Sequence, residues 1–306
     1  MMAKKIKVKK SILRQEGLGY SVFTVFNYLL LGFVILVTAY PVYYVVIASI
    51  SHPASLMRNY GLMWLPQRPL TLMAYKMVLE HPLIMSGYRN TLIVLVAGLS
   101  FNMVLTSLGA YFLCLKNSML RRPLSIFIIF TMYFNGGLVP TYLNIQDLGM
   151  VNSLWALIIP SAINTFNMLI LRSAFSAVPD SLVEVAKIDG ASHFDILTKI
   201  FLPLSGATLA VMVLYYGVGH WNAWFFASIF IQTPSKFPLQ LVLRNILLLN
   251  QNLDFAAAAA DDSVAALMAE VIKYALIVVS TAPILCLYPF LQRFFTKGVL
   301  IGAIKG

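Results

Sequence analysis

The sequence predicts an all-α integral membrane protein with six transmembrane helices, and three observations support this fold class. Of the 306 residues, 60% are hydrophobic and only 11% are charged, whereas soluble domains have about 45–50% apolar and about 25% charged residues. The apolar residues occur in long uncharged blocks, not in the alternating pattern of a strand. Six of these blocks each exceed the roughly 18 residues that a membrane-spanning helix needs. We therefore exclude a soluble enzyme, a nucleic-acid-binding domain and a disordered chain.

The six expected spans contain no Lys, Arg, Asp or Glu. They cover residues 22–50, 91–115, 123–141, 153–171, 204–231 and 274–292. The first block follows a basic segment, as in a cleaved export signal, but it is longer than the roughly 7–15 apolar residues of a signal core. We expect it to be a retained span with a kink at Pro41. Cys114 and Cys286 are expected to be buried small hydrophobic residues, not a disulfide or a metal pair.

The distribution of positive charge predicts the orientation in the membrane. Fifteen of the 22 Lys and Arg residues fall on the side of the amino terminus and seven on the other side. Because cytoplasmic loops carry an excess of Lys and Arg, this bias places both termini in the cytoplasm. The net charge of +11 then reflects topology, and we expect no nucleic-acid partner. The expected parts are a cytoplasmic amino-terminal segment (1–20), a six-span domain (21–300) and a cytoplasmic tail (301–306).

The segment 172–203 is the one long polar stretch expected on the cytoplasmic side. Gly190 lies near its middle and supplies a turn. Pro203 marks the start of the fifth span. We therefore expect two short helices that bend at Gly190 and lie near the membrane surface without crossing it.

Two helix-start signals flank this turn. Ser181 and Glu184 have the three-residue spacing of a capping box. Ser192 and Asp195 repeat the spacing more weakly, because Asp replaces the usual Glu or Gln. The sequence thus favours a cap on each of the two helices.

Signatures of catalysis are missing from the sequence. No Lys follows a Gly, so the chain has no Walker A phosphate loop and is not expected to hydrolyse ATP. None of the four His residues is followed by Glu, which excludes the HExxH zinc motif. Because the spans also lack carboxylates for a proton relay, we expect a non-enzymatic protein without a bound metal, whose energy comes from a partner.

The string from Ser181 to Pro203 resembles the cytoplasmic EAA loop of ATP-binding-cassette importer permeases. The matching residues are Glu184, Ala186, Asp189, Gly190, Ala191, Leu202 and Pro203, while Val185 stands where the motif has its first Ala. The resemblance implies the type I importer permease fold, in which this loop forms coupling helices that sit in a cleft of the ATPase subunit. It assigns ATPase coupling to Glu184, Ala186, Asp189, Gly190, Ala191 and Pro203. Two roles stay open for Glu184: capping alone, or capping together with contact to the partner.

The same resemblance implies the partners. They are a second six-span permease in a heterodimer, two ATPase subunits and an extracytoplasmic solute-binding protein. The resemblance also implies that the chain lies in the lipid bilayer of a bacterial cell membrane. The outer segments 51–85 and 232–273 would receive the loaded binding protein. This chain would bind no cofactor, because ATP and Mg²⁺ would belong to the partner ATPase.

The carboxyl-terminal string from Tyr288 to Gly306 resembles carbohydrate permeases of the maltose-transporter type, as does Asn90-Thr91 near the start of the second span. The nearest group is that of complex-oligosaccharide permeases, so the resemblance implies import of an oligosaccharide. Two alternatives stay open: an importer of the same architecture for a non-sugar solute, and a non-transport membrane scaffold or sensor. The tail Lys297–Gly306 either contacts the ATPase pair or is a frayed terminus.

A substrate path is expected where polar and aromatic residues lie inside spans, since a sugar offers both hydroxyl groups and an apolar ring face. The candidates are His220, Trp221, Asn222 and Trp224 in the fifth span, and Asn164 and Asn167 in the fourth. An alternative stays open for all six. Trp side chains anchor helices at the membrane interface, and polar side chains in spans form hydrogen bonds to neighbouring helices.

Overall fold

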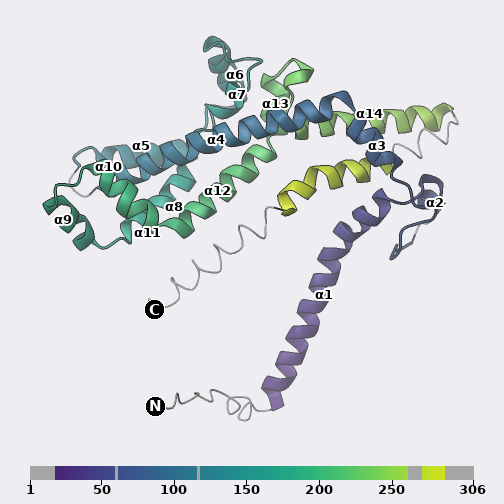
Figure 1. Cartoon of the computed structure of the whole chain (residues 1–306), viewed down its shortest axis with the longest axis horizontal. Coiled ribbons are helices and arrows are strands. Elements are labelled where there is room, and N and C mark those ends of the chain that lie inside the picture. Colours follow the sequence, from purple (N-terminus) through teal and green to yellow (C-terminus); the bar gives the residue numbers. More distant parts are fainter. Residues whose placement is uncertain (1–17, 59–60, 116–117, 261–270, 287–306) are drawn as a thin grey trace, which may run out of the picture.

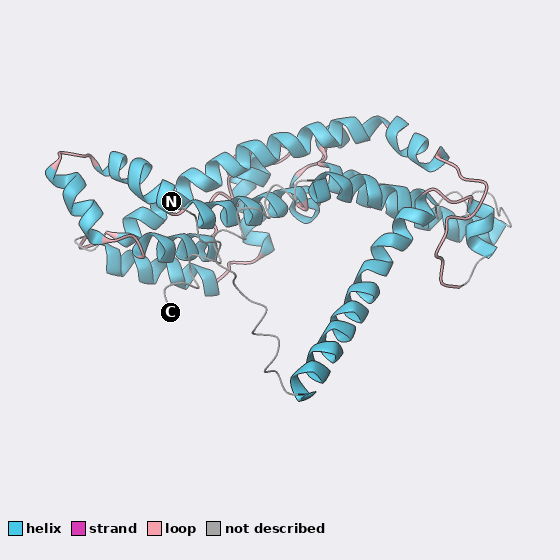
Figure 2. Cartoon of the chain, turned by 60° about the horizontal axis from the view of Figure 1, so that its bottom comes forward, coloured by secondary structure: helices cyan, strands magenta, loops and turns pink. Residues whose placement is uncertain are grey.

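A computed structural model of the chain describes residues 18–58, 61–115, 118–260 and 271–286. Every regular element in this part of the chain is a helix (Figure 2), so the predicted all-α class is confirmed. Helix α1 (Leu18–Ser49) stands apart from the other helices over most of its length (Figure 1). No residue in its most apolar membrane-length window is buried. The helix continues without a break through Pro41, the position of the expected kink.

The helices that follow α1 are α2 (Pro53–Arg58), α3 (Met73–Glu80), α4 (Pro82–Cys114), α5 (Arg121–Tyr133), α6 (Leu138–Asp147), α7 (Trp155–Ile158), α8 (Thr165–Ser176), α9 (Asp180–Ile188), α10 (His193–Ile196), the π-helical turn η2 (Leu197–Phe201), α11 (Leu202–Leu204), α12 (Gly206–Trp221), α13 (Trp224–Phe230), the 3-10 turn η3 (Pro234–Lys236) and α14 (Leu239–Ala260). A further apolar helix covers Val271–Cys286. The Ala tract at the end of α14 is helical, as its composition predicts.

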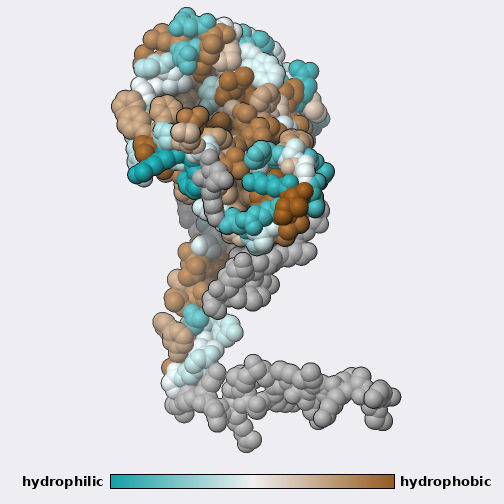
Figure 3. Space-filling model, turned by 90° about the vertical axis from the view of Figure 1, so that its left-hand side faces the viewer, coloured by the Kyte–Doolittle hydropathy of each residue, from teal (hydrophilic) through white to brown (hydrophobic). Residues whose placement is uncertain are grey.

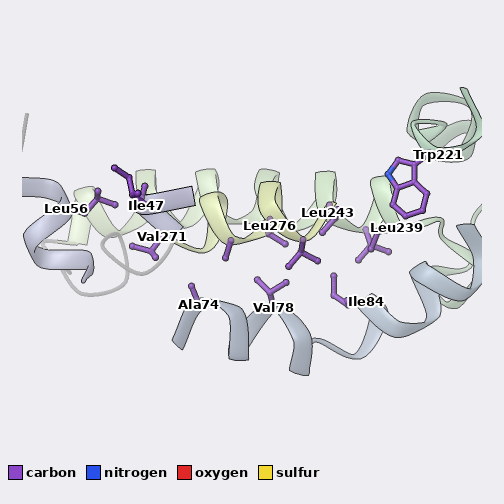
Figure 4. Close-up of a cluster of buried hydrophobic side chains, with 14 of the residues drawn as sticks. Ile47, Leu56, Ala74, Val78, Ile84, Trp221, Leu239, Leu243, Val271 and Leu276 are labelled. Carbon is purple, nitrogen blue, oxygen red and sulfur yellow. The ribbon is translucent and has the colours of Figure 1, made fainter. Parts of the chain in front are cut away.

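Helix α4 is the central pillar, because it contributes to three buried clusters. Ile84 belongs to a cluster with residues of α3, α14 and the helix Val271–Cys286 (Figure 4). Val94 belongs to a second cluster with α6, α7 and α13. Ala110 and Leu113 belong to a third cluster with α8, α10 and η2. The helices that surround α4 are thus held together through this one element.

Three glycines at eleven-residue spacing let neighbouring helices approach α4 closely. A Cβ atom at Gly98 would lie 2.5 Å from Nε2 of His220 on α12, and one at Gly109 would lie 2.5 Å from Sδ of Met168 on α8. At Gly87, it would lie 3.1 Å from the backbone of α14. Eleven residues make about three helical turns, so the glycines follow one side of α4. Small residues are common where membrane helices pack this closely.

The expected third span, 123–141, is wrong as a single helix. Helices α5 and α6 meet at an angle of 115°. Gly137 lies at this bend, immediately before α6, with a φ of 92°. This left-handed conformation is readily available to glycine, so the chain turns here even though the sequence is uncharged on both sides.

The expected fourth and fifth spans, 153–171 and 204–231, are also broken. Helix α7 ends before Pro160, and α8 begins only after Asn164. Two residues separate α12 from α13. The physical reason is that hydropathy sums side-chain polarity over a window and does not register the residues that stop a helix.

Within the described residues, α1 and α4 are long and apolar enough to cross a membrane, and the number of candidate spans rises to four if each bent helix pair counts as one. One pair is α5 with α6, and the other is the stretch His193–Leu204 with α12, bent by 85°. The expected second span, 91–115, lies within α4 except for its last residue, which follows the end of the helix. Of the expected sixth span, residues 287–292 lie outside the described part. Cys114 is half-buried against the third cluster, which meets its expected burial in part. Cys286 is exposed, so its expected burial is wrong.

Replacement of Gly98 by Ala tests the close approach of α4 and α12. Because the new Cβ atom meets His220, we expect overpacking to lower the free energy of unfolding by about 1–3 kcal/mol. The measurement is the melting temperature of the purified protein, which should be lower in the variant. Gly219→Ala on α12 is the matched control, since a Cβ atom there meets nothing within 4 Å. Melting temperatures that are equal for the two variants would contradict this packing.

Candidate functional site

Within the 172–203 segment, α9 and α10 lie on either side of a turn at Gly190, as the sequence predicts. Residues 172–176 still belong to α8, and η2 and α11 follow α10 directly. Gly190 has a φ of 80°, a conformation that glycine adopts without a steric penalty. Its amide donates a hydrogen bond to the carbonyl of Lys187 (3.1 Å), and the amide of Ala191 donates to the carbonyl of Ala186 (2.9 Å). These two bonds make a Schellman motif, which satisfies the last carbonyl groups of α9 and reverses the chain. We call this turn, with α9 and α10, the Gly190 corner.

The two helix starts differ from the sequence prediction. Helix α9 begins at Asp180, so Ser181 lies inside the first turn, and the helix start has no side-chain cap. The expected capping box of Ser181 and Glu184 is therefore wrong, and the exposed Glu184 is not used as a cap. The weaker signal is the one that forms, because Ser192 Oγ accepts from the amide of Asp195 (3.1 Å), whose carboxylate accepts from the amide of Ser192 (3.3 Å).

An ion pair strengthens the start of α10. Oδ1 of Asp195 lies 2.6 Å from Nζ of Lys199, one helical turn later. The hydrogen bond from Lys199, followed by those from Ser192, lowers the pKa of Asp195 to about 2. Asp195 is therefore a carboxylate at neutral pH, and it remains able to accept the capping hydrogen bond from Ser192.

Aromatic side chains anchor the Gly190 corner to the helices behind it. The hydroxyl group of Tyr111 on α4 shares a hydrogen bond of 2.8 Å with Nδ1 of His193 on α10. The ring of Phe201 packs edge-on against Tyr111 and against Phe175 on α8, with centroid distances of 5.2 Å and 5.3 Å. Because these contacts join α10 and η2 to α4 and α8, a displacement of the corner acts directly on both helices.

The Gly190 corner presents apolar side chains that the described part of the chain leaves uncovered. Ile188 is 85% exposed and Phe194 is 70% exposed, and Leu182 and Val185 are exposed as well. Ala186 differs, since it packs partly buried on the third cluster. Figure 3 views the end of the molecule that α9 and α10 form, where hydrophobic and hydrophilic side chains lie side by side. An exposed apolar face of this kind is typical of an interaction surface.

The structure brings most of the expected coupling residues together. Ala186, Asp189, Gly190 and Ala191 line one open pocket of about 270 Å³. Glu184 lies on the neighbouring turn of α9. Pro203 is separate from them, since it lies in α11, immediately before the 85° bend into α12. Four of the six residues thus line one pocket, whereas Glu184 lines a separate pocket beside Val183 and Lys187. Pro203 belongs to the joint that connects the corner to α12.

Among the expected substrate-path residues, His220 is buried and bonded within the chain. Its Nε2 lies 2.7 Å from Oδ1 of Asn102 on α4. The side-chain amide of Asn102 also donates to the carbonyls of Ser161 (2.6 Å) and Ala162 (3.0 Å). This arrangement matches the alternative that polar groups join neighbouring helices, and a role of His220 in the substrate path stays a prediction.

Asn164 and Asn167 also have local partners. Oδ1 of Asn164 caps α8 by accepting from the amide of Asn167 (3.0 Å). The amide of Asn164 donates to the hydroxyl group of Tyr216 (3.1 Å), which shares a further hydrogen bond of 2.7 Å with Thr106 on α4. The asparagine pair therefore orients the start of α8 against α4 and α12.

The remaining candidates point to different neighbours. Nε1 of the buried Trp221 donates to the carbonyl of Ser280 (3.2 Å). Asn222 is exposed, and its side-chain amide donates within α12. The guanidinium group of Arg244 lies 4.5 Å from the ring centroid of Trp224. The six candidates thus contact partners on different elements, and their substrate role stays a prediction.

Sequence reasoning missed Asn102 and Thr106, which supply polar contacts from α4 to its neighbours. Asn102 and Thr106 are indicated in the sequence by a spacing of four residues. Buried small or polar residues recur at Gly98, Asn102, Thr106 and Ala110. Such a row lies along one face of a helix, so it predicts a helix contact inside an apolar span.

Comparison with known protein families gives a match over most of the chain. The family described as "Binding-protein-dependent transport system inner membrane component" matches residues 100–301. Two relatives come from Bacillus subtilis (strain 168). Protein LplC is 39% identical over 286 residues, which cover 93% of this chain and 95% of the relative. The "Polygalacturonan/rhamnogalacturonan transport system permease protein YtcP" is 39% identical over 233 residues, which cover 76% of this chain and 81% of the relative.

Among solved structures, the chain is similar to one described as "Crystal structure of a bacterial ABC transporter involved in the import of the acidic polysaccharide alginate". The TM-score is 0.82 and the sequence identity is 32%. The match covers 92% of this chain and 99% of that chain. The similarity therefore extends over the whole arrangement of helices.

Ser192→Ala tests the cap that forms, and Ser181→Ala is its matched control. Loss of an N-cap hydroxyl group costs about 1 kcal/mol, so we expect the amides of α10 in Ser192→Ala to exchange hydrogen about fivefold faster. Ser181 caps nothing, and its replacement should leave the exchange of α9 unchanged. Hydrogen–deuterium exchange measured by mass spectrometry checks both. Unchanged exchange of α10 in Ser192→Ala would show that the capping box does not stabilise the corner.

Proposed function

The chain belongs to the family of binding-protein-dependent transport system inner membrane components, and from this premise we propose that it carries an oligosaccharide across the membrane. The family makes the chain a multi-pass permease component of an ATP-binding-cassette importer, with the all-helical type I permease fold. The proposed cargo follows from relatives named for polygalacturonan, rhamnogalacturonan and alginate. A carbohydrate is therefore the substrate class that the similarities favour.

The observation that carries the proposed mechanism is the exposed Gly190 corner. Helix-in-groove docking requires an apolar helical face, and Ile188 and Phe194 provide one. The Schellman motif fixes the backbone between them, and no part of Glu184 is committed to a cap. We propose that the corner docks in a groove of an ATPase subunit, with Glu184 and Asp189 opposite cations of that subunit.

The proposed importer contains a second permease, two ATPase subunits and an extracytoplasmic binding protein. The chain has six spans in this proposal, with short or bent helices in place of some continuous ones, and both termini are cytoplasmic. The outer segments 51–85 and 232–273 receive the loaded binding protein. No cofactor binds to this chain, because ATP and Mg²⁺ occupy the ATPase subunits.

Transport follows from a rigid connection between the corner and the pillar helix. Binding of ATP closes the ATPase pair and moves the two docked permeases, which is a rigid-body form of alternating access. Tyr111 and Phe201 join the corner to α4, and Phe175 joins it to α8. The displacement therefore reaches the spans and opens the path alternately to the two sides of the membrane.

Gly190→Arg tests the coupling role. A side chain is strained at a φ of 80°, and Arg would project from the docking surface. We expect the reconstituted importer to lose substrate-stimulated ATP hydrolysis and uptake, while the variant still inserts into the membrane. Gly190→Asn should keep most of both activities, because Asn tolerates the left-handed conformation.

Gly137→Arg is the matched control for backbone strain. Gly137 has a φ of 92° and open space around its Cα atom, but it lies at the bend between α5 and α6. Stimulated ATP hydrolysis should survive this change. Wild-type hydrolysis and uptake in Gly190→Arg would contradict the coupling role, and a chain that copurifies with no ATPase would indicate a scaffold or sensor.

A further inference from the structure

A second pocket, of about 480 Å³, lies beside α4 far from the Gly190 corner. Three segments line it: α4 between Arg89 and Ala97, residues 153–158, and residues 235–236. Its volume is within the range of about 300–1,000 Å³ that small-molecule sites occupy. None of its lining residues is among the candidates for the substrate path or for ATPase coupling.

Asn152 holds two sides of this pocket together. Its Oδ1 accepts from the amides of Gln232 (3.1 Å) and Thr233 (3.0 Å), and its Nδ2 donates to Oγ1 of Thr233 (2.8 Å). Its backbone amide donates to the carbonyl of Phe230 (2.7 Å). The loop before α7 and the loop after α13 are therefore fixed against each other by one side chain and its backbone.

The third side is fixed in the same way. The buried side-chain amide of Asn90 on α4 donates to the carbonyls of Ser235 (2.8 Å) and Phe237 (3.1 Å). Nζ of Lys236 donates to the carbonyl of Asn152 (2.8 Å), which places its ammonium group at the rim. Because these bonds form without a ligand, binding in the pocket requires little ordering of the protein.

The charged residues that line the pocket are all positive. Arg89 and Lys236 line it, and no Asp or Glu does. Arg89 is exposed and makes no hydrogen bond or ion pair with the described part of the chain. A guanidinium group binds a carboxylate through two parallel hydrogen bonds. The pocket is thus suited to a ligand that carries a carboxylate.

Trp155 adds an aromatic surface beside these cations. The side chain is 47% exposed, and Phe101 packs edge-on against it with a centroid distance of 5.9 Å. The electron-rich face of an aromatic ring attracts groups with a positive edge, such as the C–H bonds on one face of a sugar ring. Ser153 and Ser235, which also line the pocket, are small polar residues of the kind that bind hydroxyl groups.

We infer that this pocket binds a uronate unit of an acidic oligosaccharide, with Arg89 at its carboxylate and Trp155 against its ring. The inference rests on the proposed function and deepens it by assigning the carboxylate of the cargo to a particular site on this chain. The phosphate group of an anionic lipid is the competing occupant, because it offers the same charge to Arg89 and Lys236.

Trigalacturonate and its carboxyl-reduced counterpart, galactotriose, form a matched pair of probes. The assembled transporter, in phosphatidylcholine nanodiscs and without the binding protein, is titrated with each trisaccharide by saturation-transfer NMR. One hydrogen-bonded charge pair contributes about a tenfold difference in affinity or more, so the wild type should bind trigalacturonate at least that much more tightly. Arg89→Gln should remove the preference, and Arg89→Lys should keep part of it.

Arg122→Gln removes the same charge from α5, at the far end of α4 (Figure 1), and should leave the preference unchanged. Equal affinities of the wild type for the two trisaccharides would overturn the inference, as would a preference for trigalacturonate that persists in Arg89→Gln. Phosphatidylglycerol that copurifies with the wild type but not with Arg89→Gln, without a trisaccharide preference, would identify a lipid site and also overturn it.

Uptake separates this inference from the proposed function. If the transporter imports galactotriose or another neutral oligosaccharide and shows no preference for trigalacturonate, the inference of a uronate site is wrong, but the proposed import of a carbohydrate stands. If the transporter imports no carbohydrate at all, the proposed function is wrong as well.

Discussion

The close packing of α4 against α14, α12 and α8 is the constraint on which the rest of the structure depends. In a bilayer, lipid tails are as apolar as the helix surfaces, so close contact and hydrogen bonds hold helices together. Gly87, Gly98 and Gly109 allow the contact, since a Cβ atom at each would press against a neighbouring helix. Asn102 and Thr106 supply hydrogen bonds on the same side of α4. A larger residue at one of the glycines would press against a neighbouring helix, and an apolar residue at Asn102 or Thr106 would remove these hydrogen bonds.

The pillar helix also connects the two ends of the molecule. Its 33 residues span about 50 Å. Arg89 lines the pocket near its beginning, and Tyr111 contacts the Gly190 corner near its end. Between them, the helix is bonded to α12 through Asn102 and Thr106. The proposed binding at one end and the proposed docking at the other would therefore act on the same continuous helix, which is a physical requirement for coupling them.

The sequence predicts the features that depend on strong local signals. Charge-free blocks predict the all-α membrane class, and Gly190 predicts the corner, because a left-handed turn requires a particular residue. The breaks at Gly137 and Pro160 lie inside uncharged sequence, so hydropathy does not reveal them. The capping box of α9 fails because the helix starts two residues earlier than the Ser181 signal indicates, with Pro179 in the N-cap position.

The pocket beside Arg89 lies beyond sequence reasoning for a different reason. Its three lining segments are far apart in the chain, and the hydrogen bonds of Asn152 and Asn90 bring them together. From the sequence alone, a single arginine near the start of a span is interpreted as an anchor at the membrane interface. Its place in a pocket becomes visible only when the other lining segments are known. The row of small and polar residues along α4 is intermediate, since its four-residue spacing is visible in the sequence but its partners are not.

The docking of the Gly190 corner in an ATPase subunit is tested most directly by the reactivity of Ile188→Cys toward a water-soluble maleimide, with Cys114 and Cys286 replaced by Ser. Ile188 is 85% exposed in this chain. The account predicts rapid labelling of the permease alone and strong protection in the complex with ATPase subunits. Gln146→Cys, at an exposed position of α6, should react equally in both samples. Labelling of Ile188→Cys that is equally rapid with and without ATPase subunits would contradict the account.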